Sequence, residues 1–141
     1  MYYVKNFKIW ELVPPDVYAA RGEKAIELLD DRALITLDQL REKFGVTVVN
    51  TYMSPNMIKG FGLRQECGLR WTGTDVGAKY SQHKRGAAFD CLFRDHSAKS
   101  VREYVMAHPN EFPYINAIES GVSWFHFDCR NCERITVFPV G

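Results

Sequence analysis

A histidine and an aspartate lie seven residues apart in the segment SQHKRGAAFD, residues 81–90. The apolar residues around the aspartate are typical of a buried strand, where a carboxylate is costly to bury unless a cation, a metal ion or several hydrogen-bond donors lie beside it. Lys84 and Arg85 are the simplest partners for Asp90. The alternative is zinc, which binds histidine nitrogen and carboxylate oxygen and in catalytic sites combines three protein ligands with water. His83 and Asp90 are therefore candidate ligands.

The candidate third ligand is His126, in the segment ESGVSWFHFD, residues 119–128. Side chains alternate between the two faces of a strand, so Trp124, His126 and Asp128 are expected on one face and the phenylalanines between them on the other. A histidine among aromatic residues is also a common core residue. That interpretation stays open for His126 and equally for His83.

Glu119 is the candidate general base. A two-residue turn at residues 120–121 or 121–122 would fold the preceding strand back onto the strand that carries His126. Either turn places Glu119 on the face of His126, at a diagonal cross-strand separation of roughly 7–8 Å. A carboxylate at that separation could take a proton from a metal-bound water without itself binding the metal.

The helices that support these residues are predicted from apolar periodicity and from helix-end signals. Apolar residues recur at helical spacing between Ala25 and Phe44, which predicts two helices with a break between them. The first helix is expected to begin at residues 14–16, where two prolines precede an aspartate, and Gly45 ends the second. A third helix is expected to begin after Ser97 as its N-cap and to end near residue 109.

The strands are predicted from runs of β-branched and aromatic residues. We expect them at residues 46–52, 87–93, 114–120, 123–130 and 134–140, with a long, partly helical connection at 53–82. Short links between the closing strands favour antiparallel pairing. The sequence therefore predicts an α+β fold, with helices packed on one side of a mostly antiparallel sheet.

Length and composition bound the function. The chain of 141 residues is expected to form one domain, residues 1–141, and its net charge of +1 gives no reason to expect nucleic acid as a partner. No apolar run approaches the roughly 18 residues of a membrane span, and the N-terminal residues lack the apolar core of a signal peptide. We therefore expect a protein made in the cytoplasm, and a monomer.

Several cysteine and aromatic residues have less defined expectations. Without an export signal we expect free thiols, with two disulfides as the alternative, at Cys67, Cys91, Cys129 and Cys132. The last two form a Cys-x-x-Cys pair that lacks a matching second pair, so structural zinc binding with a remote pair is the other possibility. His96 and His108 are interpreted as helix-boundary residues. Trp71 and Tyr80 are candidates for lining a substrate groove, or ordinary packing residues.

The segment SQHKRGAAFD resembles the Ser-x-His-x-x-Gly-x-Ala-x-Asp signature of the zinc D-Ala-D-Ala carboxypeptidase and L-Ala-D-Glu endopeptidase family, and SWFHFD resembles the later Trp-x-His motif of that family. The positions that match the signature are Ser81, His83, Gly86, Ala88 and Asp90. Weak similarity extends over residues 46–130. The resemblance implies the hedgehog/DD-peptidase fold, which many phage cell-wall lytic enzymes share. It also implies one zinc ion per chain, bound by His83, Asp90 and His126.

The chain departs from the family pattern at the catalytic acid. Many members carry the acid three residues before the last histidine, where this chain has Ser123. Glu119 then resembles the acid of members in which it stands further upstream. Asp128 is the fallback, although a residue two positions along a strand from a ligand is better suited to orient that ligand.

A second departure concerns substrate binding. Many relatives carry a Tyr-Arg-Ser-Pro-like stretch whose arginine helps to bind substrate, whereas this chain has TYMSP with Met53. Arg64 or Arg70 could supply the missing positive charge, or either could be a solvated loop residue. Ser81 and Trp124 are also expected beside the ligands or the substrate.

The resemblance predicts a function with one alternative. The expected function is zinc-dependent hydrolysis of a peptide bond in the stem peptide of bacterial peptidoglycan, by a phage endolysin released to the cell wall or by a component of a phage particle. The alternative is a zinc-stabilised, non-catalytic binding or phage structural module of the same fold. Ser123 and Met53 are the two substitutions that favour the alternative.

Overall fold

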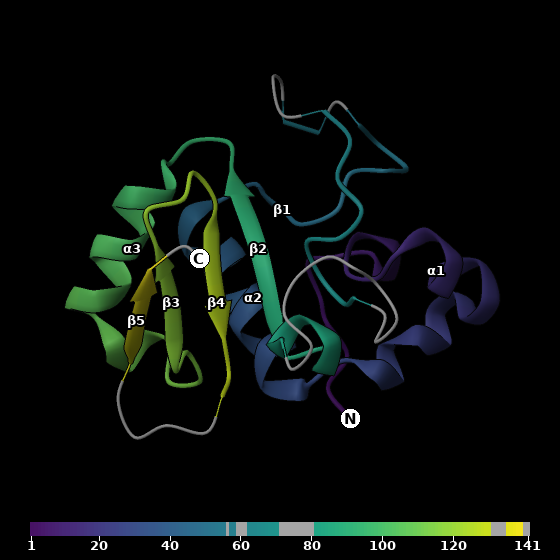
Figure 1. The fold of residues 1–141 in the computed structure, drawn as a ribbon, viewed down its shortest axis with the longest axis horizontal. Helices are drawn as coiled ribbons and strands as arrows, with labels where there is room; N and C mark the ends of the chain where they lie inside the picture. Colours follow the sequence, from purple (N-terminus) through teal and green to yellow (C-terminus); the bar gives the residue numbers. More distant parts are fainter. Residues whose placement is uncertain (56, 59–61, 71–80, 131–134, 140–141) are drawn as a thin grey trace.

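The sheet organises the molecule. A computed structural model of the chain describes residues 1–55, 57–58, 62–70, 81–130 and 135–139. Within these residues, one sheet has the strand order β1-β2-β4-β3-β5 (Figure 1). Its strands are β1 (Thr47–Val48), β2 (Ala88–Phe93), β3 (Ala117–Ser120), β4 (Phe125–Asp128) and β5 (Thr136–Pro139). All neighbouring strands pair antiparallel except β3 and β5, so the predicted α+β class with a mostly antiparallel sheet is confirmed.

The described helices begin and end close to the capping residues that the sequence indicates. They are α1 (Pro15–Arg21), α2 (Asp31–Phe44) and α3 (Ala98–Ala107), with short 3-10 helices η1 (Ile9–Glu11), η2 (Gly22–Leu28), η3 (Gln82–Arg85) and η4 (Pro109–Glu111). The Asp30 carboxylate caps α2 by accepting from the Arg32 N–H, and Ser97 caps α3 in the same way. Gly45, at a φ of 82°, ends α2. None of the described helices is long and apolar enough to cross a membrane.

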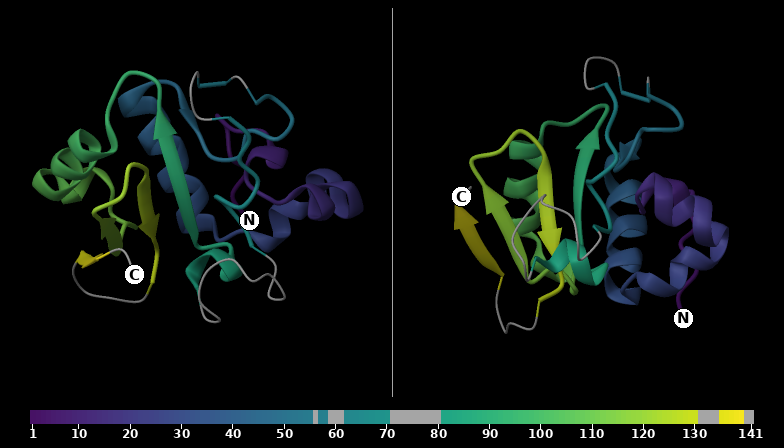
Figure 2. Two further views of the ribbon diagram at one scale, coloured as in Figure 1. Left: turned by 45° about the horizontal axis from the view of Figure 1, so that its top comes forward. Right: turned by 45° about the vertical axis from the view of Figure 1, so that its right-hand side comes forward.

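One face of the sheet is apolar and the other carries the polar residues of interest. Phe89, Cys91, Phe125 and Phe127 are fully buried in the main hydrophobic core. That core also contains apolar residues of α2 and α3, and both helices contact β2. Figures 1 and 2 show these two helices on the same side of the sheet. Because side chains alternate along β2 and β4, Asp90 and His126 face away from this core.

The strand predictions need three corrections. The predicted strand 46–52 is reduced to β1, because the backbone N–H of Asn50 bonds to Glu11 and that of Thr51 to Arg64 instead of continuing the sheet. Antiparallel pairing is expected for the last strand, but β5 pairs in parallel with β3, on the side of β3 away from β4. The link between β3 and β4 is four residues, 121–124, and not a two-residue turn.

Gly86 allows η3 to pack closely against the start of α2. It adopts a φ of +67°, and a Cβ at this position would lie 2.2 Å from the carbonyl oxygen of Leu28. The Gly86 carbonyl accepts a hydrogen bond from the Asp30 N–H at 3.0 Å. Glycine is therefore required both by the backbone conformation and by the space. The contact fixes the position of η3, which carries His83.

Candidate metal centre

The three predicted ligands lie together. His83 comes from η3, Asp90 from β2 and His126 from β4, and one ligand atom from each lies within 4.8 Å of the other two. Their exposed fractions are 3%, 6% and 7%. Exposed acidic groups gather on many surfaces, but a buried group of two imidazoles and one carboxylate is a donor set suited to a metal ion. These residues could therefore hold a metal ion.

Local structure accounts for the convergence. Asp90 and His126 are direct partners in the antiparallel pair of β2 and β4. The Asp90 N–H does not bond to β4 but donates to the Cys67 carbonyl at 2.7 Å, so Asp90 and His126 form a non-hydrogen-bonded pair, in which facing side chains approach most closely. His83 is held by the cap of η3, where the Ser81 hydroxyl accepts from its backbone N–H.

The ring nitrogens that face the centre differ between the two histidines. His126 Nδ1 lies 2.8 Å from Asp90 Oδ1, and His83 Nε2 lies 3.4 Å from the same oxygen and 3.2 Å from His126 Nδ1. The other nitrogen of each ring contacts an acceptor: His83 Nδ1 lies 3.0 Å from the Gly68 carbonyl and His126 Nε2 lies 3.0 Å from Asp128 Oδ2. When the outer nitrogens carry the protons, the lone pairs of the two inner nitrogens, His83 Nε2 and His126 Nδ1, are available to bind a metal ion.

The charges of the centre are strongly coupled. Burial by itself would lower the pKa of His126, but hydrogen bonds to Asp128 and Asp90 outweigh it and raise the pKa to about 9. Burial by itself would raise the pKa of Asp90, but hydrogen bonds to His126 and His83 hold it well below its ordinary value. In the metal-free protein a proton on His126 therefore supplies positive charge that a metal ion would replace.

Of the two candidate arginines, Arg70 lies beside the centre. Its Nη2 lies 3.2 Å from Asp90 Oδ2 and its Nε donates to the Glu66 carbonyl at 2.7 Å. Arg64 donates to Cys67 Sγ and to the backbone carbonyl of Asp90, so it supports the backbone of β2. The expectation that Lys84 or Arg85 neutralises Asp90 is wrong: within the described residues the ion-pair partners of the carboxylate are Arg70 and the two histidines.

Glu119 lies on the face of the centre, as predicted. Ala117 pairs with Asp128 and Ile118 with Phe127, so the alternation along β3 puts Glu119 on the same face as Asp128 and His126. The predicted turn is wrong but the predicted face is right. Both a two-residue and a four-residue link have an even number of residues, so either one leaves Glu119 on the same face of the sheet as His126. Glu119 is half-buried, and within the described residues no hydrogen bond or ion pair is recorded for its carboxylate.

Trp124 and Asp128 take different places beside the centre. Trp124 precedes β4 and packs on a small apolar cluster of Val48, Ile58 and Leu92. Its indole N–H is buried and has no hydrogen-bond partner among the described residues. Asp128 is fully buried and contacts His126, which fits the expectation that it orients a ligand. Burial by itself would raise the pKa of Asp128, but hydrogen bonds from Arg130 and His126 lower it to about 2.

Sequence reasoning missed three residues of this environment. The Gly68 carbonyl gives no sequence signal, since any residue supplies a carbonyl. Arg130 lies two residues beyond the end of β4 and continues the spacing of His126 and Asp128, which could have indicated it. Phe138, whose ring centroid lies 5.4 Å from that of His126, comes from β5, whose position beside β3 was not predicted.

The other expectations concern peripheral residues. His96 precedes the N-cap of α3 and His108 is its C-cap, as interpreted. Within the described parts of the chain, the thiols of Cys67, Cys91 and Cys129 are free, as expected. Trp71, Tyr80 and Cys132 lie outside the described residues.

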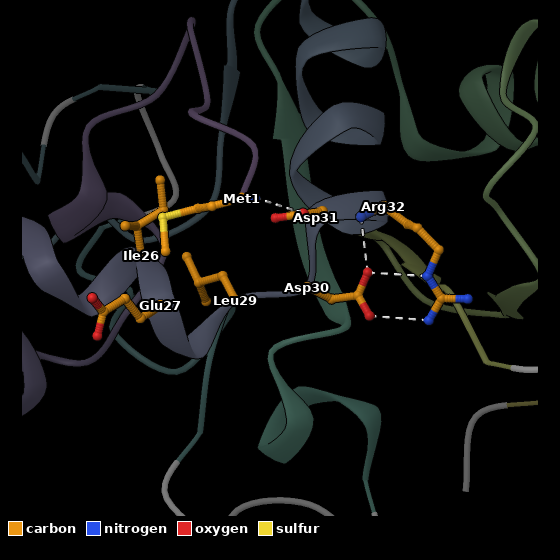
Figure 3. Close-up of a pocket in the computed structure, with 7 residues that line it drawn as sticks. All are labelled: Met1, Ile26, Glu27, Leu29, Asp30, Asp31 and Arg32. Atoms are coloured by element: carbon orange, nitrogen blue, oxygen red, sulfur yellow. Dashed lines mark hydrogen bonds and ion pairs between the residues drawn. The ribbon is translucent and has the colours of Figure 1, made fainter.

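A hollow of about 450 Å³ lies at the start of α2 (Figure 3). It is lined by Met1, Ile26, Glu27, Leu29, Asp30, Asp31 and Arg32. Asp30 pairs with Arg32 at 3.0 Å, and the amino group of Met1 lies 3.7 Å from Asp31. Since these charges are paired with one another and none of the three candidate ligands lines the hollow, it is separate from the metal centre.

Comparison of the chain with protein-family models, with curated proteins and with solved structures gives no match. The function therefore has to be argued from the centre itself.

Proposed function

We propose that the protein is a zinc peptidase that hydrolyses a peptide bond in the stem peptide of bacterial peptidoglycan. The observation that carries the proposal is the buried group of His83, Asp90 and His126, whose inner atoms converge within 4.8 Å. Two histidine nitrogens and one carboxylate oxygen are a typical set for catalytic zinc, which keeps a fourth position for water. Glu119, on the same face, is the acidic residue that such a site requires.

A bound zinc ion would supply a water with a pKa lowered toward about 7 and would polarise the carbonyl of the scissile bond. Glu119 takes the water proton on its carboxylate and passes it to the nitrogen of the leaving amine. The Glu119 side chain is suited to this because it lies on the ligand face without a recorded partner among the described residues.

Arg70 is the better candidate for binding substrate. Its Nε donates to the Glu66 carbonyl and its Nη2 donates to the Asp90 carboxylate. Its Nη1 has no hydrogen-bond partner among the described residues. A guanidinium nitrogen at the edge of the centre suits a substrate carbonyl or carboxylate. Arg64 is turned toward Cys67 and the backbone of Asp90, which leaves it a supporting role.

The substrate class follows from the resemblance of residues 81–90 and 123–128 to the signature motifs of zinc D-Ala-D-Ala carboxypeptidases and L-Ala-D-Glu endopeptidases. Both activities act on the stem peptide. A phage endolysin, or a component of a phage particle, is the setting that we propose for such an activity, because many enzymes with these motifs are phage cell-wall lytic enzymes.

The decisive experiment compares Glu119→Gln with the wild type. Glutamine keeps the shape but cannot accept the proton, so the variant should bind one zinc ion per chain and lose at least about 100-fold in hydrolysis of purified peptidoglycan. Glu103→Gln, on the exposed side of α3, is the matched control and should keep full activity. Full activity of Glu119→Gln would refute its assignment as the base.

Two substitutions favour the alternative of a non-catalytic, zinc-stabilised binding or phage structural module. Ser123 stands where many members of the family carry their acid, and Met53, which is 54% exposed, stands where they carry the substrate arginine. Turbidity of outer-membrane-permeabilised cells, measured with and without chelator, separates the two functions. A fully zinc-loaded sample that neither clears cells nor cuts purified peptidoglycan would support the non-catalytic module.

A further inference from the structure

Four side chains form a closed ring of contacts on the outer side of His126. His126 Nε2 lies 3.0 Å from Asp128 Oδ2, and the guanidinium of Arg130 binds both oxygens of Asp128 at 2.7 Å. The Arg130 guanidinium lies over the ring of Phe138, 4.9 Å from its centroid. The Phe138 ring closes the circle, 5.4 Å from the His126 ring at an interplanar angle of 82°.

Each contact in the ring restricts the next one. Two parallel hydrogen bonds from a guanidinium fix the plane of the carboxylate, which a single bond would leave free to rotate. A cation within about 6 Å of an aromatic centroid is attracted to the face of the ring, so Phe138 limits where Arg130 can lie. The Asp128 carboxylate is fully buried, which makes an unpaired orientation of it costly.

The position of Phe138 depends on β5, one of the two edge strands of the described sheet. β5 pairs in parallel with β3, with Phe138 opposite Glu119, and the Phe138 carbonyl accepts from the Ser120 hydroxyl at 3.3 Å. Phe138 is half-buried and does not belong to the main hydrophobic core. Its contacts with Arg130 and His126 therefore give it a role toward the centre that core packing does not explain.

We propose that Arg130 and Phe138 are positioning residues of the metal centre, which hold Asp128 so that His126 keeps its proton on Nε2 and presents Nδ1 as the ligand atom. The inference rests on metal binding by this centre and does not require hydrolysis. Outer partners of metal-binding histidines typically change metal affinity by about 10- to 100-fold when they are removed.

The first test measures zinc affinity by competition with a chelator. Arg130→Gln should weaken zinc binding by about tenfold or more, and Phe138→Leu should weaken it in the same direction by a smaller factor. Phe138→Tyr keeps the aromatic face and should retain the wild-type affinity. Val137→Ala is the matched control, because Val137 is the preceding residue of β5 and is 50% exposed; Arg94→Gln controls for the loss of an exposed arginine.

A spectroscopic test separates positioning from a general effect on stability. The visible absorption bands of the cobalt-substituted protein report ligand geometry, so Arg130→Gln and Phe138→Leu should shift these bands while Val137→Ala leaves them unchanged. If Arg130→Gln does not fold, Phe138→Leu carries the test by itself. Wild-type affinity and wild-type bands in Phe138→Leu, together with those of any folded Arg130→Gln, would overturn the proposal.

A measurement on the metal-free protein keeps the inference distinct from the proposed function. Nitrogen chemical shifts of the His126 ring, recorded at alkaline pH where the ring is neutral, report which nitrogen carries the proton. Asp90 Oδ1 lies 2.8 Å from Nδ1 and competes with Asp128 for the proton, so Phe138→Leu should raise the fraction of rings protonated on Nδ1 above that of the wild type. If the wild type binds no zinc, the proposed function fails, and these shifts still decide whether Arg130 and Phe138 fix the tautomer.

Discussion

At the residue scale, His83 and His126 have the same role as candidate metal ligands, but they present different ring nitrogens to the centre. His83 presents Nε2 because the Gly68 carbonyl lies next to its Nδ1, and His126 presents Nδ1 because Asp128 lies next to its Nε2. The identity of the ligand atom is thus set by the group behind each ring and not by the histidine itself. Asp90 and Asp128 differ in the same way. The Asp90 carboxylate contacts the inner ring nitrogens of both histidines, whereas the Asp128 carboxylate contacts the outer ring nitrogen of His126.

Replacement of any one ligand should abolish stoichiometric metal binding. Alanine at His83, Asp90 or His126 leaves two ligands, and the remaining buried polar groups lose their shared partner. Metal content after dialysis, measured by atomic emission, should fall from one ion per chain to a small fraction. His96→Ala, at an exposed position before α3, is the control and should retain the metal. A ligand variant that keeps one tightly bound ion would contradict the assignment of that residue.

At the scale of elements, the strand alternation could be predicted from the sequence and the neighbours of the strands could not. Period-two alternation placed His126, Asp128 and Glu119 on one face, and it holds although the turn is longer than expected. The approach of Arg70 depends on the backbone bond from Asp90 to Cys67, which joins segments far apart in the chain and leaves no local pattern. The same limitation applies to β5. It pairs with β3 and not with β4, its neighbour in the sequence, and no local pattern indicates that choice.

The segment of residues 66–70 supports two ligands at once. The Cys67 carbonyl accepts from the Asp90 N–H and the Gly68 carbonyl lies against His83. The segment is itself held by the Leu69 N–H, which donates to the Leu12 carbonyl at 2.8 Å. A small shift of this segment would therefore move the supports of both His83 and Asp90.

Gly68→Ala tests this coupling. A Cβ at Gly68 would lie 2.3 Å from the carbonyl oxygen of Leu12, so the segment has to move. We expect a loss of about 1–3 kcal/mol in the free energy of unfolding, as for other overpacked sites, together with weaker zinc binding. Denaturant titration and chelator competition measure the two effects. Gly22→Ala is the control: it meets no atom within 4 Å and is strained only by its φ of +57°, so it should lower stability without changing zinc affinity.

At the scale of the whole molecule, the N-terminal segment is joined to the metal centre through Asn50. This fully buried side chain donates to the Val13 carbonyl and accepts from the Cys67 N–H, both at 3.0 Å. The residues that form or support the metal centre therefore come from each third of the sequence. Because these contacts form only in the folded protein, metal binding and folding are expected to be linked.

This linkage should remove the contribution of His126 to the pH dependence of stability when saturating metal is added. In the metal-free protein the pKa of His126 is raised from 6.5 to about 9, so its contribution is fully present below about pH 6.5 and is lost as the pH rises through 9. The metal-free protein should lose of the order of 2–3 kcal/mol over that window. Zinc binds the deprotonated ring, so the stability that zinc adds should rise over the same window.

Denaturant titrations between pH 6 and 9.5, with chelator and with saturating zinc, measure both slopes. His126→Gln removes the titrating imidazole and should flatten the metal-free profile between about pH 6.5 and 8, below the range in which the buried thiols contribute, because their pKa values are raised by burial. His108→Ala, an exposed helix-end variant, should leave the wild-type slope. Asp90 and Asp128 do not contribute to the slope, because both have lowered pKa values and stay charged throughout the window. A zinc increment that is independent of pH would show that His126 gives up no proton on binding, and would exclude it as a ligand.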